Sequence, residues 1–139
     1  MTSLIVSCDG AARGNPGPAG AGSQITTPDG VMVAEIAEGL GETTNNVAEY
    51  TAVILGLERA QELGATDVLL RSDSQLLINQ ITGVYRVKTP HLQPLHRRVR
   101  KLAAGFGSIR FEHIPRERNT EADRLANLGV DTWLASQGR

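Results

Sequence analysis

Cysteine and long apolar runs are nearly missing from this sequence. Cys8 is the single cysteine among 139 residues, so no disulfide can form within the chain, and its place in an apolar run favours a buried thiol without a chemical role. No apolar run approaches the roughly 20 residues that span a bilayer, and the start MTSLIVSCDG has neither a basic region nor a cleavage site. We therefore expect a cytoplasmic protein that does not contact a membrane.

Acidic residues are missing from one long stretch. All fifteen acids lie outside residues 74–111, a range that carries seven basic residues: Arg86, Lys88, Arg97, Arg98, Arg100, Lys101 and Arg110. The net charge of the whole chain is only −1, so this positive charge is local. Such a surface is typical of a protein that binds a polyanion. A solvated helix face that arginine keeps soluble is the alternative.

The order of the apolar segments predicts an α/β fold in a single domain over residues 1–139. Residues 3–9 form a strand, and residues 20–39 form two more, joined at the turn Pro28-Asp29-Gly30. A helix over residues 45–64 then leads into a fourth strand. A helix between two strands is the usual crossover of a parallel pair, so the fourth strand should run parallel to one of the first three.

The rest of the chain continues the alternation of strands and helices. The expected elements are a strand at 66–73, helices at 74–81 and 89–107, a fifth strand at 108–115 and a final helix at 119–136. The length suits one hydrophobic core, so we look for one site.

Two aspartates stand where strands are expected to end. Asp9 closes the first strand and Asp73 closes the fourth. Ligands of open α/β sheets bind beyond the carboxyl ends of parallel strands, so the two acids meet at one edge if these strands are neighbours. Each acid also fits a purely local role, Asp9 in a turn with Gly10 and Asp73 as the cap of the helix that begins at Ser74.

Two further acids are expected on the inward faces of helices. Glu49 shares a face with Ala52 and Val53, and Asp123 shares one with Ala126. A carboxylate facing a sheet is costly without a partner. Both acids also fit capping boxes, Asn46 to Glu49 and Thr120 to Asp123, which explain the spacing but not the inward direction.

Four converging acids need a counter-charge, because like charges raise one another's pKa. A divalent cation supplies it, and carboxylate ligands suit Mg²⁺ or Mn²⁺. His91, His96 and His113 are scattered, so no zinc cluster is expected. Two such ions a few Å apart activate water for phosphodiester hydrolysis.

Four segments resemble the type 1 ribonuclease H family. They are CDGAARGNPGPAGAG, TTNNVAEYTAVILGL, RSDSQLLINQI and RNTEADRLAN, in the family's order and spacing. The resemblance implies a five-stranded mixed sheet of order 3-2-1-4-5, with strands 1–3 antiparallel and strands 4 and 5 parallel to strand 1, flanked by helices. The family's acid quartet corresponds to Asp9, Glu49, Asp73 and Asp123.

The resemblance implies an endonuclease that hydrolyses the RNA strand of an RNA·DNA hybrid with two Mg²⁺ or Mn²⁺ ions. By analogy Asp9 bridges both ions, Asp123 helps to hold the one that carries the attacking water, and Glu49 and Asp73 complete the other. Glu49 also touches the RNA. The substrate contacts implied are Gly10, Ala11, Ala12, Asn15, Asn45 and Gln75 in the minor groove, where a 2′-OH is sensed without reading sequence, and Thr44 and Asn46 beside the DNA strand.

The sequence departs from the family pattern in two places. Only GVYRVKTP stands where many members carry a basic helix and loop, so the grip on the hybrid should depend on Arg97, Arg98, Arg100 and Lys101 and be weaker and more salt-sensitive. The loop PRERN lacks the usual histidine. His113 lies ten residues before Asp123 but within the fifth strand, so we favour Arg116 or Arg118 near the scissile phosphate.

Other functions remain open from the sequence. A non-catalytic nucleic-acid-binding domain of the same fold is one alternative, and another nuclease of the wider superfamily is a second. The chain also resembles the N-terminal ribonuclease H domain of bacterial bifunctional proteins with an acid phosphatase domain behind it, so an excised domain is a further possibility. We expect a monomer.

Overall fold

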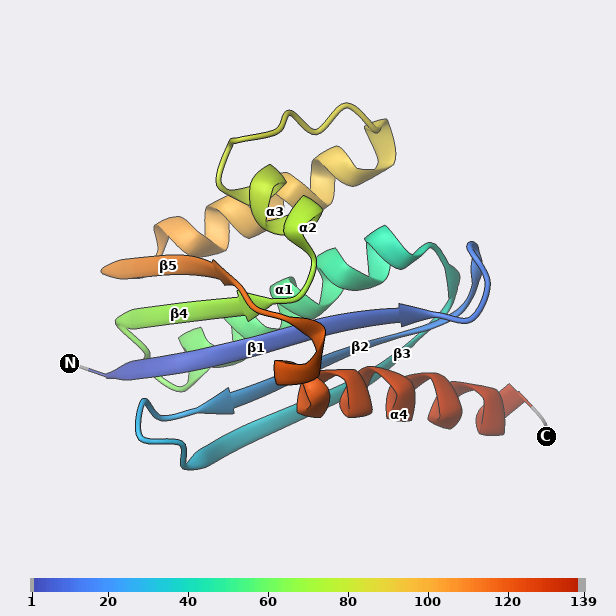
Figure 1. The fold of residues 1–139 in the computed structure, drawn as a ribbon, viewed down its shortest axis with the longest axis horizontal. Helices are drawn as coiled ribbons and strands as arrows, with labels where there is room; N and C mark the ends of the chain where they lie inside the picture. The colour runs from blue at the N-terminus through green and yellow to red at the C-terminus, as the bar shows by residue number, and fades with distance from the viewer. Residues whose placement is uncertain (1, 138–139) are drawn as a thin grey trace.

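The computed structural model describes residues 2–137, in which five strands form one mixed sheet (Figure 1). The strands are β1 (Ser3–Ala12), β2 (Gly17–Thr26), β3 (Met32–Thr43), β4 (Asp67–Ser72) and β5 (Ser108–His113). They lie in the order β3-β2-β1-β4-β5. β2 pairs antiparallel with β1 and β3, whereas β4 pairs parallel with β1 and β5. The predicted strand order and directions are confirmed.

Helices cover both faces of this sheet (Figure 1). The helices are α1 (Asn45–Glu62), α2 (Gln75–Ile81), α3 (Gln93–Ala104) and α4 (Thr120–Gln137), with 3₁₀ turns η1 (Pro90–Leu92) and η2 (Arg116–Arg118). α1 packs on β1 and β2 and contacts α3, while α4 packs on β1, β2 and β3 from the other side. Among residues 2–137, no helix combines the length and apolar character required to cross a membrane.

The prediction that β1 ends at Asp9 is wrong. β1 continues to Ala12 because it stays paired with β2, with Asp9 opposite Gly22 and Ala12 opposite Ala19. Its parallel pairing with β4 stops one residue earlier, at Cys8 opposite Ser72. Asp9 is therefore the first residue beyond the paired part of β1 and β4, and the expected loop is confined to residues 13–16.

The helix starts exclude the local roles considered for the acids on α1 and beside α2. Thr44 caps α1, its hydroxyl accepting a hydrogen bond from the Val47 amide at 3.2 Å, so the capping box from Asn46 to Glu49 is wrong. Ser74 caps α2 by accepting from the Leu77 amide at 3.2 Å. Asp73 is therefore not the cap.

Other predicted boundaries also shift. α4 begins at Thr120 itself, so Thr120 is a helical residue and not the cap that a box with Asp123 requires. The helix expected over 89–107 divides into η1 and α3, since Pro94 lies in the first turn of α3 and fits a helix start. β2 begins at Gly17 and β3 extends to Thr43, both beyond the expected 20–39.

The core lies between the sheet and α1. Alternate residues of β1, Leu4, Val6 and Cys8, are buried, as the period of a strand requires. The hydroxyl of Ser23 on β2 donates to the carbonyl oxygen of Ala52 in α1 at 2.7 Å. Cys8 is fully buried, and burial raises the pKa of its thiol to about 12, which agrees with the prediction of a structural thiol.

On the opposite face, α4 packs directly on the backbone of β2 at Gly22. A Cβ atom at this position would collide with the backbone of Ala122 and Ala126. Because both partners are main-chain atoms, no side-chain rotation could relieve the clash. Gly22 therefore fixes how closely the first turns of α4 approach the sheet.

We expect Gly22→Ala to lower the free energy of unfolding by about 2–3 kcal/mol, because α4 would have to move away from β2. Urea denaturation measures this change. Gly105→Ala is the matched control. Its Cβ would lie 3.3 Å from the nearest atom, the Leu102 carbonyl oxygen, so this substitution should lower the free energy of unfolding much less. Equal losses in the two variants would contradict the close packing of α4 on β2.

Candidate active site

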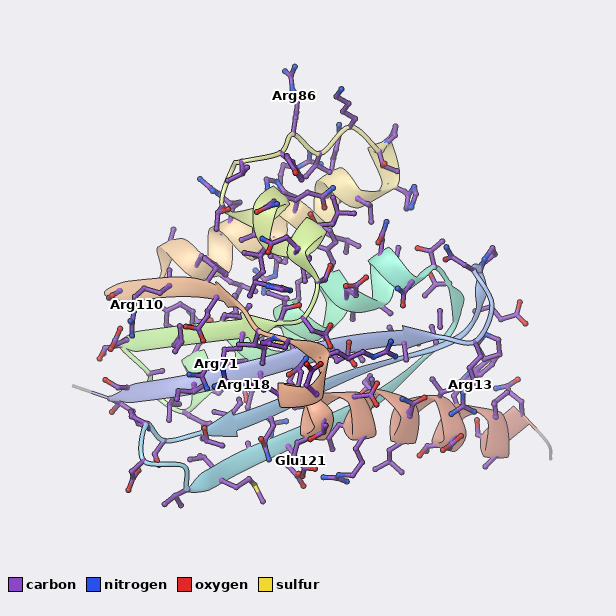
Figure 2. The ribbon with its side chains drawn as sticks, in the orientation of Figure 1. Arg13, Arg71, Arg86, Arg110, Arg118 and Glu121 are labelled. Carbon is purple, nitrogen blue, oxygen red and sulfur yellow. The ribbon has the colours of Figure 1, made fainter. Side chains whose placement is uncertain are left out.

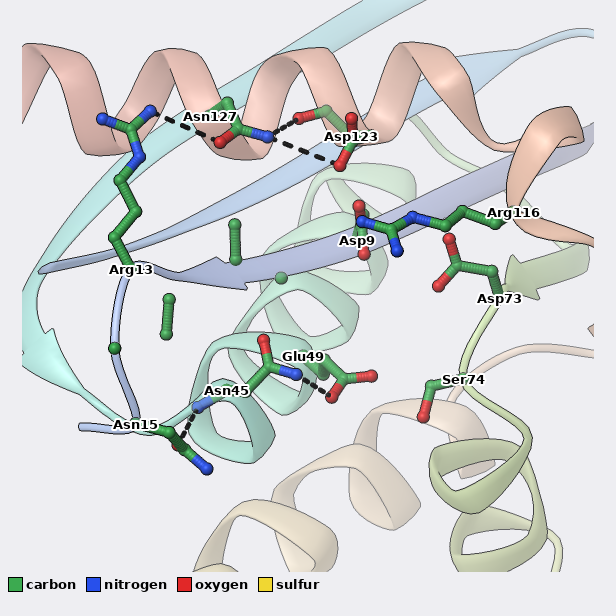
Figure 3. Close-up of a pocket in the computed structure, with 14 residues that line it drawn as sticks. Asp9, Arg13, Asn15, Asn45, Glu49, Asp73, Ser74, Arg116, Asp123 and Asn127 are labelled. Atoms are coloured by element: carbon green, nitrogen blue, oxygen red, sulfur yellow. Dashed lines mark hydrogen bonds between the residues drawn. The ribbon is translucent and has the colours of Figure 1, made fainter. Parts of the chain in front are cut away.

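Asp9, Glu49, Asp73 and Asp123 line one open cleft of about 730 Å³ (Figure 3). Each of them is half-buried. Asp9 belongs to β1, Asp73 follows β4, Glu49 lies near the start of α1 and Asp123 lies in the first turn of α4. The fold thus brings together all four acids that the sequence predicts to converge.

The direction of Asp9 follows from its pairing partner. Residues that face each other across an antiparallel pair share one side of the sheet, and Gly22, the partner of Asp9, faces Ala122 and Ala126 of α4. Asp9 therefore points toward the face that α4 covers, where Asp123 lies. Asp73 is close because β4 is the parallel neighbour of β1.

Gly10 places Glu49 beside this pair. A Cβ atom at Gly10 would overlap the backbone of Ala48 and Glu49, so the start of α1 rests directly on β1. The absence of a side chain at Gly10 therefore brings Glu49 next to Asp9. This packing role was not predicted from the sequence, in which the small residues after Asp9 suggested an approach to substrate.

Asn119 ties β1 to α4 and was missed in the sequence. Its side-chain NH₂ group donates to the Cys8 carbonyl oxygen at 2.9 Å, and its backbone carbonyl oxygen accepts from the backbone amide of Asp123 at 3.1 Å. The residue is buried. These bonds fix the distance between the strand that carries Asp9 and the helix that carries Asp123. Its place as the first residue of the helix predicted over 119–136 was the available clue.

The acids destabilise one another's charged forms. Burial, followed by the charges of Asp73, Asp123 and Glu49, raises the pKa of Asp9 from 3.8 to about 8. Burial also raises the pKa of Glu49, the Asp73 charge adds to the rise, and the hydroxyl of Ser74 offsets part of it. The cleft therefore holds more negative charge than its surroundings compensate.

The predicted substrate contacts divide into two groups. Five of them line the cleft: Gly10, Ala11, Ala12, Asn15 and Asn45. Asn15 lies in the β1–β2 turn, and its side-chain oxygen accepts a hydrogen bond from the backbone amide of Asn45 at 3.0 Å. Thr44, Asn46 and Gln75 stand at the starts of α1 and α2 but are not among the residues that line this cleft.

Among the candidates for the missing loop histidine, Arg116 lies at the cleft. It belongs to η2 and extends over Asp9 and Asp73 in Figure 3. Arg118 lies in the same turn (Figure 2) and His113 ends β5, and both are outside the lining of the cleft as described. Arg13, Ser74 and Asn127 also line it; they lie within the family-like segments, but none was predicted as a site residue.

The basic stretch does not form one surface. Arg86 projects from the loop after α2, whereas Arg110 lies on β5 (Figure 2). Arg98 pairs with Glu58 of α1 at 2.9 Å, and Arg100 donates to the Ile81 carbonyl oxygen at 3.0 Å. Arg97, Arg98, Arg100 and Lys101 are exposed, but a separate cleft of about 610 Å³ takes in only Arg86, Arg97 and Arg100 of the basic residues.

Comparison with known proteins assigns the chain to a family. A family model described as reverse transcriptase-like matches residues 7–129. The crystal structure of RNase H1 from the halophilic archaeon Halobacterium salinarum NRC-1 has a TM-score of 0.91 and 43% sequence identity, over 94% of this chain and 98% of that one. The chain belongs to the ribonuclease H family. The resemblance seen in the sequence is confirmed.

Two further relatives of this ribonuclease H chain are informative. LC11-RNase H1, isolated from compost and solved in complex with an RNA/DNA hybrid, has a TM-score of 0.89 and 43% identity over 94% of this chain and 99% of that one. The bifunctional protein Rv2228c of Mycobacterium tuberculosis is 45% identical over 134 residues, 96% of this chain and 37% of that protein. The chain thus spans little more than a third of that relative's length.

The acids of this ribonuclease H chain fit a divalent cation by charge and donor type. Carboxylate oxygens are the ligands that hard divalent cations prefer. None of the ion pairs within residues 2–137 involves the four acids. No three acidic, histidine or cysteine side chains in that range are gathered closely enough to hold one ion, so the fit rests on uncompensated charge and on the oxygen donors.

We expect Asp9→Asn to stabilise the metal-free protein at pH 8 by about 1–3 kcal/mol. Folding raises the pKa of Asp9 from 3.8 to about 8, so this carboxyl group loses its proton at a lower pH in the unfolded chain than in the folded protein. The wild type should therefore lose stability as the pH rises through this range. Urea denaturation with a chelator at pH 5 and pH 8 measures both effects.

Asp29→Asn, in the exposed β2–β3 turn, is the control for removing a negative charge elsewhere. It should leave the pH dependence of wild type in place. An Asp9→Asn variant with the same pH dependence as wild type would refute the mutual repulsion of the acids.

Proposed function

We propose that the chain is an endonuclease that hydrolyses the RNA strand of RNA·DNA hybrids with two divalent cations, Mg²⁺ or Mn²⁺. The convergence of Asp9, Glu49, Asp73 and Asp123 in one cleft carries the proposal. Family membership supports it, as does the hybrid bound to LC11-RNase H1. The open shape of the cleft suits a long polymeric substrate.

The positions of the four acids suggest which cation each of them would hold. A pair of divalent cations supplies an activated water and a stabilised leaving oxygen when bound. Asp9, whose pKa responds to each of the other three acids, is proposed to hold both cations. Asp123 would hold the one on the α4 side, and Glu49 and Asp73 the other. Together the four carboxylates would hold the cations that position the scissile phosphate.

The walls of the cleft are proposed to read the sugar of the RNA. Gly10, Ala11 and Ala12 line it together with Asn15 and Asn45, and the backbone groups of the first three would contact the sugar. Because the Asn15 oxygen is already bonded to the Asn45 amide at 3.0 Å, the Asn15 NH₂ group is the part left to donate to a 2′-OH.

The contacts farther from the acids complete the proposed binding surface. Gln75 would extend the minor-groove contacts, and Thr44 and Asn46 would lie beside the DNA strand. Arg116 would approach the scissile phosphate, and Arg118 would support the same strand from η2. Arg97, Arg98, Arg100 and Lys101 stay predicted contacts that strengthen binding at low salt.

The organisation of the whole protein is also a proposal. Rv2228c is described as bifunctional and is much longer than this chain, which supports a second domain, predicted to be an acid phosphatase, behind residues 1–139. A single ribonuclease H domain over these residues, a monomeric state and a cytoplasmic location stay predictions.

Asp73→Asn should reduce hydrolysis of an RNA·DNA hybrid by roughly 1,000-fold, since a lost metal ligand removes several kcal/mol of transition-state stabilisation. Hybrid affinity should change little. Labelled-hybrid cleavage with Mg²⁺ or Mn²⁺ and a separate binding titration measure the two effects.

Duplex DNA and duplex RNA are the substrate controls for this experiment. Wild type that binds the hybrid without cutting it would indicate a non-catalytic binding domain. Cleavage of duplex DNA in preference to the hybrid would indicate another nuclease of the superfamily. Asp73→Asn that cuts as well as wild type would refute the proposed mechanism.

Arg116→Ala should lower kcat on the hybrid by roughly 10-fold to 100-fold, because a cation at the reacting phosphate stabilises developing negative charge. Arg118→Ala and His113→Ala should have smaller effects, since neither side chain lines the cleft with the acids. Steady-state kinetics on the three variants tests this order. A larger loss for His113→Ala would assign the loop role to the histidine.

A further inference from the structure

Arg13 and Asn127 connect the β1–β2 turn to the acid on α4. Asn127 lies one helical turn after Asp123 and Asp131 one turn later, so the three share one face of α4. The guanidinium of Arg13 reaches across this face, with its Nη1 2.8 Å from an Asp131 oxygen and its Nη2 donating to the Asn127 Oδ1 at 3.4 Å. Figure 3 shows Arg13, Asn127 and Asp123 side by side in that order along the cleft.

The partners of Asn127 fix the orientation of its amide. A guanidinium can only donate, so the side-chain oxygen of Asn127 must face Arg13. The NH₂ group then faces Asp123, where it donates to the backbone carbonyl oxygen at 3.0 Å and to the carboxylate Oδ1 at 3.4 Å. Both neighbours therefore require the same orientation of the amide.

We propose that Arg13 and Asn127 form a positioning relay that orients the Asp123 carboxylate for a divalent cation. This inference rests on the proposed role of Asp123 as a metal ligand. Asn127 donates to one of the two carboxylate oxygens of Asp123, and Arg13, paired with Asp131, donates to Asn127. Hydrogen bonds behind a ligand fix its direction and raise its affinity for metal.

A neutral amide suits this place in an acidic cleft. A lysine or arginine in direct contact with Asp123 would compete with the cation for the carboxylate charge. Asn127 orients the carboxylate without neutralising it, and the positive charge of Arg13 stays one residue farther away, paired with Asp131. The pair of Arg13 and Asp131 is exposed, so its contribution to the free energy of unfolding should be small. Its effect on the orientation of the Asp123 carboxylate should be larger.

The test is calorimetric titration of Mn²⁺ into the hybrid-free chain, together with kcat and KM on the hybrid. Asn127→Ala should weaken Mn²⁺ binding by about 10-fold and lower kcat with little change in KM. Arg13→Ala should cause a smaller loss in the same direction, and Arg13→Lys should recover part of it. The Arg13→Ala, Asn127→Ala double variant should match Asn127→Ala alone, because Arg13 acts through Asn127.

Arg124→Ala is the matched control. Arg124 is an exposed arginine of α4 that pairs with Glu35 at 2.7 Å, outside the cleft, so Mn²⁺ affinity should stay at the wild-type value. Wild-type Mn²⁺ affinity in Asn127→Ala, additive losses in the double variant, or no Mn²⁺ binding by wild type would overturn the relay. A raised and salt-dependent KM in Arg13→Ala, with unchanged Mn²⁺ affinity, would also overturn it and make Arg13 a phosphate contact.

The two proposals fail separately. Loss of Mn²⁺ affinity in Asn127→Ala, with no cleavage of any hybrid by wild type, would retain the relay and reject the proposed function. Cleavage by wild type, with Mn²⁺ affinity unchanged in Asn127→Ala, would do the reverse.

Discussion

Repulsion among Asp9, Glu49, Asp73 and Asp123 is the constraint on which the rest of the structure depends. Half-buried carboxylates that raise one another's pKa separate unless the surrounding structure holds them. The holding contacts are main-chain contacts: β4 pairs in parallel with β1, and Gly10 lets α1 rest on β1. On the other face, Gly22 lets α4 rest on β2. The packing of the core therefore offsets the stability that is lost through repulsion among the four acids.

Asparagine side chains provide the second level of organisation around the cleft. Asn119 joins β1 to α4, Asn45 donates to the Glu49 carboxylate at 3.4 Å, and Asn127 donates to Asp123. A neutral amide can orient a carboxylate while leaving its charge available. Figure 3 shows two series of hydrogen bonds on opposite sides of the cleft, one from Asn15 through Asn45 to Glu49 and one from Arg13 through Asn127 to Asp123.

Each acid taken alone was ambiguous in the sequence, and the local structure resolved each in a different way. Thr44 and Ser74 cap the helices that Asn46 and Asp73 were considered to cap, and Asp9 lies inside a strand and not in a turn. A contact between residues that are distant in sequence carries no periodic pattern. Arg13 and Asn127, separated by 114 positions, are therefore invisible to spacing arguments.

The apolar periodicity of the sequence by itself determined the class of fold. The resemblance of four segments to the ribonuclease H family implied the strand order and the four candidate acids. Only the tertiary structure decided where β1 ends and which of Arg116 and Arg118 reaches the cleft. It also decided that Gly10 serves helix packing. These features depend on which backbone segments meet, Asp9 with Gly22 across a sheet and Gly10 with Ala48 against a helix. Contacts of this kind are set by the whole fold and not by neighbouring residues.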